Sequence, residues 1–319
     1  WPGSSVFTGF EFCLQAETTK KSNRMVNLFM ICILPVGRKA LFLITGISIF
    51  TISMETKLIS STQNPLVKNI LQLKEKSRER KKTGLFVVEG QREIELAQKG
   101  GYALQTLLFC PEIMGSDSVT PFTKASSPEI IQVSESVYGK VAHRSTTEGI
   151  LGIMESKNHA LENIIFKNKT PLVLVAEAPE KPGNIGALLR TADAAAVDAV
   201  LIANPKSDLY SPNIIRSSVG CLFTNQIGVG TTDEIIAFLQ TNQIKIYCAA
   251  LTASKNYVDC DFKAASALVM GTEATGLTDT WLQNSDQNII IPMQGEIDSM
   301  NVSVSAAILI FEAKRQRGF

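Results

Sequence analysis

The sequence predicts two α/β units, of which the second contains a mostly parallel sheet. Its 319 residues correspond to about two domains at the usual ~100–200 residues per domain. The apolar run PLVLVAEA, residues 171–178, is typical of a parallel strand buried on both faces. Similar short runs alternate with helical stretches up to the last residue, which is the order of a parallel α/β sheet.

The composition excludes several classes of protein. A chain that is 45% hydrophobic and 19% charged is not largely disordered. The net charge of +1 excludes a polycation, so contacts with nucleic acid would come from a local patch. The two histidines and six scattered cysteines, with no CxxC pair, indicate no metal site. Free thiols of this kind fit a reducing, cytoplasmic location.

Residues 1–53 differ from the rest of the chain. Two apolar runs, 28–37 and 40–52, are separated by Arg38 and Lys39, and neither reaches the roughly 18–20 residues of a membrane span. We favour a non-native or mis-annotated leader without a membrane role, followed by a true start at Met54. A membrane-associating or partner-binding segment and a transmembrane hairpin remain as alternatives. Without this leader the chain has 26 basic and 28 acidic residues, a net charge of −2.

The first unit, residues 54–157, combines short strands and helices. The spacing of apolar residues predicts a helix over 64–82, followed by a strand at LFVVEG, residues 85–90. Residues 158–170 are polar and predict a linker. Basic residues outnumber acidic ones around the first helix. They form either a solvated face or a phosphate-binding patch, whose candidate members are Lys74, Arg78, Arg80, Lys81, Lys82 and Arg92.

The second unit, residues 171–319, carries the candidate site. Strands are predicted at 171–178, 199–203, 245–251, 267–271 and 288–293, with helices at 185–196, 211–220 and 302–317. Ligands of such sheets bind beyond the carboxyl ends of the strands. Three segments at these strand ends carry candidate functional residues. Segment 181–195 contains Asn184 and Arg190, segment 268–277 contains Gly271 and Glu273, and segment 289–309 contains Ser299 and Asn301. Taken singly, each loop is equally well explained as a helix start, a tight turn or a helix cap.

In combination, these loops resemble the three motifs of the SpoU (TrmH-like) family of SPOUT RNA methyltransferases. The matching patterns are NxGxxxRTA, then GxExxGL, then IPM followed by SxNVSV, over residues 171–317. The first unit resembles, more loosely, the L30e-like substrate-binding domain of the family, through NPLVKNIL, FVVEGQREI and GILGI. One departure is Ala196, which stands where the family often has glycine after the first motif's helix.

The resemblance implies a fold, a cofactor and a reaction. The fold is an α/β-knot, with a deep trefoil knot at the carboxyl end of the sheet, and the expected oligomer is a homodimer through this region. S-adenosylmethionine would be bound mainly by backbone groups, and its methyl group would be transferred to a ribose 2′-hydroxyl of structured RNA, rRNA rather than tRNA. The implied cofactor lining is Leu251, Thr252, Gly271, Ile291, Met293, Met300 and Asn301.

The matching positions also imply catalytic roles. Arg190 takes the place of the family's essential arginine. Because a guanidinium stays protonated in proteins, we expect it to bind a phosphate or the developing alkoxide. Asn184, Glu273, Ser299 and Asn301 would orient the hydroxyl, with Glu273 as a candidate proton acceptor, and Arg216 is a further candidate phosphate contact. The alternatives are an RNA base methyltransferase and a non-catalytic RNA-binding or ribosome-assembly factor with the same fold.

Overall fold

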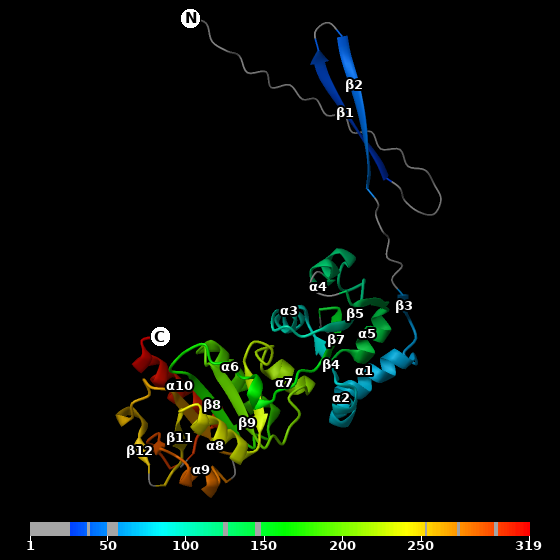
Figure 1. Cartoon of the computed structure of the whole chain (residues 1–319). Coiled ribbons are helices and arrows are strands. Elements are labelled where there is room, and N and C mark those ends of the chain that lie inside the picture. The colour runs from blue at the N-terminus through cyan, green and yellow to red at the C-terminus, as the bar shows by residue number, and fades with distance from the viewer. Residues whose placement is uncertain are drawn as a thin grey trace, which may run out of the picture. The chain divides into compact units, whose positions relative to one another are not determined.

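A computed structural model describes residues 26–36, 39–49, 57–123, 127–143, 148–252, 254–272, 275–296 and 299–319. The chain divides into two compact units, Trp1–Thr56 and Lys57–Phe319. In the first unit, β1 (Val26–Val36) and β2 (Lys39–Ile49) pair antiparallel (Figure 1). In the described part of the chain, no helix has the length and apolar character that a membrane crossing requires.

The second unit contains two sheets, the first of which has five strands in the order β3-β6-β5-β7-β4. Strand β7 pairs antiparallel with both β4 and β5. The elements of this part are β3 (Lys57–Ile59), α1 (Pro65–Glu75), α2 (Ser77–Thr83), β4 (Leu85–Glu89), α3 (Gln91–Lys99), β5 (Leu104–Phe109), α4 (Thr120–Thr123), β6 (Glu129–Val133), α5 (Glu135–Val141) and β7 (Ile150–Glu155).

The predicted helix over 64–82 is two helices. Helix α1 begins after Asn64, whose side chain accepts a hydrogen bond from the backbone N–H of Leu66 at 2.8 Å. It ends at Lys76, where the backbone is extended (φ −111°, ψ 110°) before α2 begins. The single-helix prediction was therefore wrong at this residue, because apolar periodicity does not report a break between two adjoining helices.

The second sheet has seven strands in the order β10-β9-β8-β13-β11-β14-β12, and all its described pairs are parallel. The predicted α/β fold with a mostly parallel sheet is thus confirmed. Its elements are β8 (Leu172–Glu177), α6 (Pro182–Ala194), β9 (Ala199–Ala203), α7 (Pro212–Ser217), β10 (Ile227–Gly230), α8 (Thr232–Thr241), β11 (Lys245–Ala249), β12 (Lys255–Asn256), β13 (Ser266–Met270), α9 (Asp279–Gln283), β14 (Gln287–Ile290) and α10 (Val302–Arg317).

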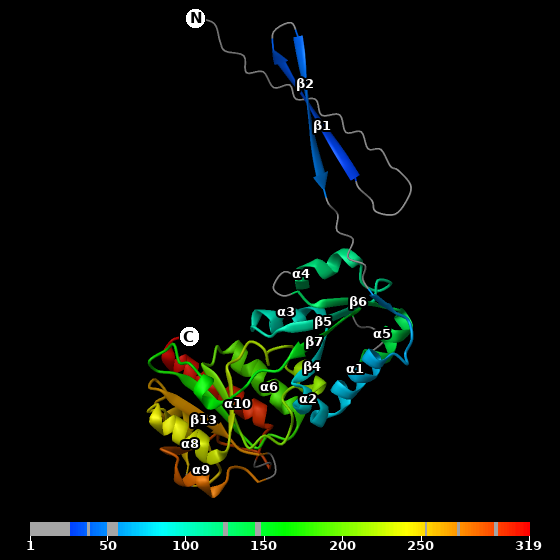
Figure 2. The ribbon, with the colours of Figure 1, turned by 45° about the vertical axis from the view of Figure 1, so that its right-hand side comes forward.

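Helices cover this sheet on both faces (Figures 1 and 2). On β8, Leu172 and Leu174 pack into the core shared with α6 and α10, while Val173 and Val175 pack into the core shared with α8 and α9. Successive side chains of a strand point to opposite faces. A strand between two helical layers must therefore be apolar throughout, which explains the continuous run in the sequence.

The two sheets of the second unit are joined by a buried interface. The Arg80 Nε donates to Asp208 Oδ2 at 2.6 Å, and both side chains are largely buried. Next to this ion pair, the rings of Phe86 and Tyr210 stack with their centroids 4.4 Å apart. One hydrophobic core runs from Phe86 on β4 to Leu174 on β8. Burial of shared apolar surface favours a fixed arrangement of the two sheets.

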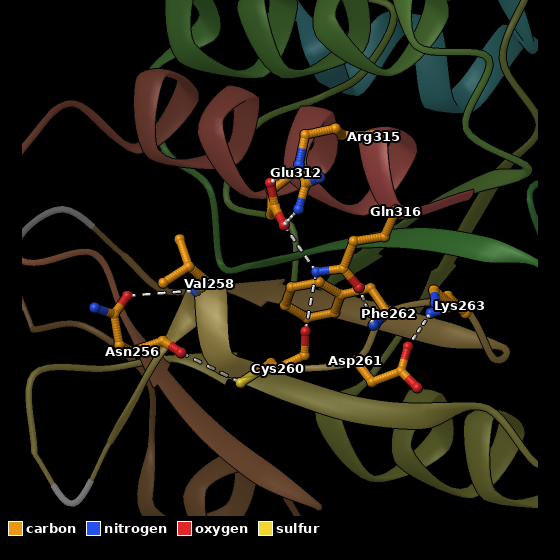
Figure 3. Close-up of polar contacts among 9 residues, drawn as sticks. All are labelled: Asn256, Val258, Cys260, Asp261, Phe262, Lys263, Glu312, Arg315 and Gln316. Atoms are coloured by element: carbon orange, nitrogen blue, oxygen red, sulfur yellow. Dashed lines mark hydrogen bonds and ion pairs between the residues drawn. The ribbon is translucent and has the colours of Figure 1, made fainter. Parts of the chain in front are cut away.

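The last helix is attached to the loop that follows β12 (Figure 3). The side chain of Gln316 accepts from the Phe262 N–H at 2.8 Å and donates to the Cys260 carbonyl at 2.9 Å. Arg315 forms two hydrogen bonds to Glu312 at 2.8 Å one turn earlier. These contacts hold the carboxyl-terminal turns of α10, whose other end enters the candidate site.

Candidate active site at the carboxyl edge of the parallel sheet

The loops predicted to bind the cofactor leave the same edge of the sheet. Strand β11 lies between β13 and β14, and all three are parallel. Gly271, Leu251 and Ile291, which come directly or nearly directly after these strands, therefore emerge side by side. The backbone N–H of Ala250 donates to the carbonyl of Ile289 in β14 at 3.0 Å, which holds the start of the loop after β11 against the neighbouring strand. The topology gives one continuous ligand-binding edge.

The first and third motifs meet through two asparagines. Asn301 Nδ2 donates to Asn184 Oδ1 at 3.1 Å, although the residues are 117 positions apart. Asn301 is also the N-cap of α10, since its Oδ1 accepts from the backbone N–H of Ser303 at 2.9 Å. A capping side chain satisfies an otherwise unpaired N–H at the helix start. The same amide thus begins α10 and orients Asn184.

The second motif forms a tight loop after β13. The Thr272 N–H donates to the Gly276 carbonyl at 3.0 Å, and the Gly276 N–H donates back at 3.1 Å. A Cβ added to Gly271 would lie 2.4 Å from the carbonyl carbon of Gly276, closer than real Cβ contacts. Gly271 is therefore required for this close backbone approach. Glu273, the candidate proton acceptor, lies outside the described residues.

Most of the predicted cofactor lining lies at the surface of this edge. Leu251 is 59% exposed and Thr252 and Asn301 are exposed, whereas Gly271, Ile291, Met293 and Met300 are half-buried. Within the described residues, the backbone N–H groups of Leu251, Met293 and Met300 have no hydrogen-bond acceptor. Unpaired backbone groups on an open, partly apolar edge fit a cofactor that is bound by the main chain. Ser299 is exposed two residues before the α10 cap.

A cavity of about 540 Å³ opens on the other side of Gly271. It lies over the carboxyl ends of β8, β9 and β13, and Asn184 and Gly271 are in its wall. The remaining lining residues are Ala176, Glu177, Ala178, Pro179, Glu180, Lys181, Leu188, Asn204, Lys206, Thr272, Thr275, Gly276, Thr278 and Val302.

A buried carboxylate in this wall was missed by the sequence analysis. Glu177 is only 4% exposed, and its oxygens accept from Trp281 Nε1 at 2.5 Å, Thr232 Oγ1 at 2.9 Å and Asn204 Nδ2 at 3.3 Å. Hydrogen bonds from several donors offset the cost of burying a charge. An acidic residue inside the apolar run of residues 171–178 was the available signal.

Among the described residues, no hydrogen bond joins Arg190 to the asparagine pair. Arg190 is exposed and lies six residues after Asn184, which on a helix is a rise of about 9 Å and a rotation of about 240°. Its charge acts instead on Cys221, as does the charge of Arg92 from α3. Burial and then Asp193 raise the pKa of that thiol to about 11, and the two arginines oppose the rise. Arg190 on α6 and Arg92 on α3 therefore both lie near Cys221.

The predicted phosphate-binding residues separate into exposed and buried ones. Arg80 is 6% exposed, and its guanidinium contacts Asp208 and the carbonyls of Leu73 and Lys74. These contacts occupy the guanidinium of Arg80 inside the protein and set it apart from the exposed members of the predicted patch. Lys74 is largely buried and bonded to Glu89 and the Val141 carbonyl. The remaining candidates are exposed: Arg78, Lys81, Lys82, Arg92 and Arg216.

Comparison with known proteins gives the family of this chain. A model of the SpoU rRNA Methylase family matches residues 171–311, and a model of the MRM3-like substrate binding domain matches residues 64–152. A 23S rRNA guanosine 2′-O-methyltransferase of Bacillus subtilis is 28% identical over 258 residues, which cover 81% of this chain and 99% of that protein.

Solved structures agree with these matches. The crystal structure of an RNA 2′-O ribose methyltransferase is 34% identical with a TM-score of 0.70, over 82% of this chain and 100% of the other. An AdoMet-bound rRNA methyltransferase from Sinorhizobium meliloti is 27% identical with a TM-score of 0.75, over 82% of this chain and 98% of the other. The resemblance of the three loops is confirmed, and the chain belongs to the SpoU rRNA methylase family.

Proposed function

We propose that this protein transfers a methyl group from S-adenosylmethionine to a ribose 2′-hydroxyl of ribosomal RNA. The observation that carries the proposal is the hydrogen bond between Asn184 and Asn301. It joins the first and third motifs of the family at the carboxyl edge of the parallel sheet, next to the loop of the second motif. Membership of the family and the AdoMet-bound relative support the same chemistry.

The cofactor would lie on the edge formed by the loops after β11, β13 and β14. Leu251, Thr252, Gly271, Ile291 and Met293 would hold it, together with Met300 and Asn301 at the start of α10. S-adenosylmethionine supplies an electrophilic methyl group on a sulfonium. The contribution of the chain is to place the acceptor oxygen in line with that methyl group, and such positioning lowers a barrier substantially.

Asn184, Asn301 and Ser299 are the groups that would orient the acceptor hydroxyl. The amide of Asn301 is held by the helix cap and by Asn184, so its orientation is set before substrate arrives. Glu273 would take the hydroxyl proton. Arg190 is exposed and fits the role of a clamp on a backbone phosphate.

The RNA would contact the first sheet as well as the second. Helix α3 sits closely on the turn after α7: a Cβ on Gly220 would lie 2.8 Å from Leu96 Cδ1, and one on Gly100 would lie 2.2 Å from the Phe223 carbonyl oxygen. This packing fixes Arg92 near Arg190. Arg92 and Arg190, together with the exposed cations of α2 (Arg78, Lys81 and Lys82), would form a phosphate-binding surface. Residues 54–157 would then act as the L30e-like RNA-binding domain, and residues 171–319 as the methyltransferase domain after the linker 158–170.

The active form would be a homodimer through α10. Val304 and Phe311, seven residues apart on one face of this helix, are 48% and 40% exposed, and Ile308 between them is half-buried. An apolar stripe of this kind marks an interface. We also place a trefoil knot at the carboxyl edge of the sheet and the enzyme in the cytoplasm, where ribosomal RNA is available.

The test is transfer of labelled methyl from S-adenosylmethionine to bulk rRNA and tRNA from a strain that lacks the enzyme. We expect label in rRNA, as a 2′-O-methyl nucleoside after digestion. Label in a methylated base would indicate a base methyltransferase. RNA binding without any transfer would indicate a non-catalytic assembly factor.

A further inference from the structure

The cavity over β8 and β9 is separate from the edge that would hold the cofactor. Along the sheet, β9 and β8 lie on one side of β13, and β11 and β14 lie on the other. Gly271 at the end of β13 belongs to both regions, and Asn184 opens into the cavity. A group bound in the cavity would therefore lie beside the proposed methyl donor and next to Asn184. Its volume of about 540 Å³ is within the range of small-ligand sites, ~300–1,000 Å³.

The walls of the cavity suit a planar, polar-edged group. Pro179, Leu188 and Val302 supply apolar surface, on which the face of a nucleobase can stack. Asn204 and Glu180 supply side-chain oxygens, and Lys206 supplies an ammonium. Enzymes that act on an extruded nucleotide read the base through its Watson–Crick edge and pack its faces against apolar side chains.

The amide of Asn204 is fixed before any ligand binds. Its Nδ2 donates to Thr232 Oγ1 at 2.8 Å and to Glu177 Oε1 at 3.3 Å. The Thr232 hydroxyl in turn donates to Glu177 Oε2 at 2.9 Å, which closes a ring of three residues. Within the described residues, Asn204 Oδ1 accepts no hydrogen bond. Asn204 lines the cavity with its amide nitrogen held by Thr232 and the buried Glu177, which leaves its amide oxygen available as an acceptor.

The backbone of Asn204 also indicates a specialised position. Its φ is +46°, in the left-handed region that asparagine adopts more readily than most residues. Ala178, which lies beside it at the end of β8, has a φ of +40°, and its N–H donates to the Ala203 carbonyl at 2.8 Å. Two adjacent strands therefore end in uncommon conformations at the floor of one cavity. Strain of this kind gathers at functional sites.

We propose that this cavity binds the base of the nucleotide to be methylated, that Asn204 is its specificity-determining residue, and that the preferred base is guanine. The proposal rests on the proposed function for its place in the reaction. Guanine presents two neighbouring N–H donors, N1 and N2, and the acceptor O6. Asn204 Oδ1 and the Glu180 carboxylate match the donors, and the Lys206 ammonium matches O6. Adenine, uracil and cytosine each lack the paired donors.

The first test is binding, and it is independent of catalysis. Saturation-transfer NMR on the full chain would compare 5′-GMP with 5′-UMP, and we expect 5′-GMP to bind at least about fivefold more tightly. Asn204→Gly removes the amide, and glycine accepts the left-handed φ without steric cost. Gln243→Gly is the matched control, because Gln243 has a φ of +56° and is not in the lining of this cavity. We expect only N204G to abolish the preference.

The second test is turnover on RNA. Synthetic fragments carrying the mapped target would contain guanosine, inosine or adenosine at the acceptor position. We expect kcat/KM to fall in that order, by about tenfold or more from guanosine to adenosine. In N204G the three values should lie within about threefold, with unchanged affinity for S-adenosylmethionine. Thr232→Val should reduce discrimination in part, and Thr232→Ser should retain it.

These outcomes separate the inference from the proposed function. A modified nucleoside other than guanosine, or an equal preference for 5′-GMP in wild type and N204G, would overturn the inference while methyl transfer stands. Absence of transfer to any RNA would overturn the proposed function. In that case the Asn204-dependent preference for 5′-GMP would still establish the base-binding cavity.

Discussion

Asn301 donates a hydrogen bond from its amide nitrogen to the amide oxygen of Asn184, 117 residues earlier, at 3.1 Å. The opposite end of the same Asn301 amide caps α10. The two functions use different atoms, so they can be separated by substitution. The relationship therefore gives a direct test of whether the contact between the motifs matters for catalysis or only for folding.

Asn301→Asp should separate stability from activity. The aspartate retains the oxygen that caps α10 and adds a charge that is favourable at a helix start, but it cannot donate to Asn184. We expect an unchanged melting temperature and a loss of kcat of about 100-fold. Asn301→Ala should lose activity and also about 1 kcal/mol of stability. Full activity in the aspartate variant would exclude a catalytic role for the contact.

Arg190→Ala should retain cofactor binding and lose turnover. The side chain is exposed and Arg190 is not among the residues predicted to line the cofactor, so calorimetry should give the same affinity for S-adenosylmethionine. Removal of one charge-stabilising group typically lowers kcat by about 10²–10³-fold. Equal losses of cofactor affinity and turnover would show that Arg190 is structural.

Arg80→Ala should destabilise the protein. It leaves Asp208 buried without its partner, and removal of one member of a buried ion pair costs about 3–5 kcal/mol. For a chain of this size the melting temperature should fall by about 10 °C. Thermal unfolding followed by circular dichroism measures the melting temperature. A fall of less than about 2 °C would contradict a stabilising role for the buried Arg80–Asp208 ion pair.

The double variant Lys81→Ala/Lys82→Ala should weaken RNA binding without destabilising the protein, in contrast to Arg80→Ala. Both side chains are exposed on α2, so the melting temperature should not change. If they contact phosphates, the slope of log K against log salt for RNA binding should become shallower by about two. An unchanged slope would remove α2 from the phosphate-binding surface.

Stability should fall in mild acid because of His159. Burial lowers the pKa of this imidazole, whose Nε2 lies 2.8 Å from the Tyr210 hydroxyl. The folded state therefore favours the neutral ring, and the unfolded chain takes up the proton first. The stabilisation of the folded state by the neutral His159 ring is fully present above the unfolded pKa of about 6.5. It is lost as the pH falls through the lower pKa of the folded state. Melting curves at pH 7.5 and 5 should differ more for the wild type than for His159→Gln.

Phe311→Asp should give a monomer if α10 forms the dimer interface. A charge in the centre of an apolar interface is costly when it is desolvated. Light scattering should show halved mass, whereas Ile165→Asp, at a side chain that is 68% exposed, should not change it. A monomeric wild type would contradict the homodimer.

The sequence predicted the strands of the seven-stranded parallel sheet better than it predicted the contacts between residues far apart in the chain. Continuous apolar runs located β8, β9, β11 and β13, because two-sided burial leaves a clear pattern. The helix predicted at 185–196 is α6, Pro182–Ala194. Ala196, where the family often has glycine, has a φ of +46°, so the departure is tolerated at a position that favours glycine.

Tertiary partners could not be predicted in this way. Arg80 was grouped with its basic neighbours, since only Asp208, 128 residues later, reveals that it is buried. Glu177 depends on Trp281, 104 residues later. Strand β10 and helix α8 were missed, although Thr231 and Glu234 form a capping box at the start of α8, a signal present in the sequence.

The most direct test of the central claim is alkaline hydrolysis of RNA labelled from methyl-tritiated S-adenosylmethionine. Alkaline cleavage requires a free 2′-hydroxyl, so a 2′-O-methyl group protects the following linkage. The account predicts that the label from rRNA appears in alkali-stable dinucleotides. Label in mononucleotides would place the methyl group on a base and contradict ribose methylation.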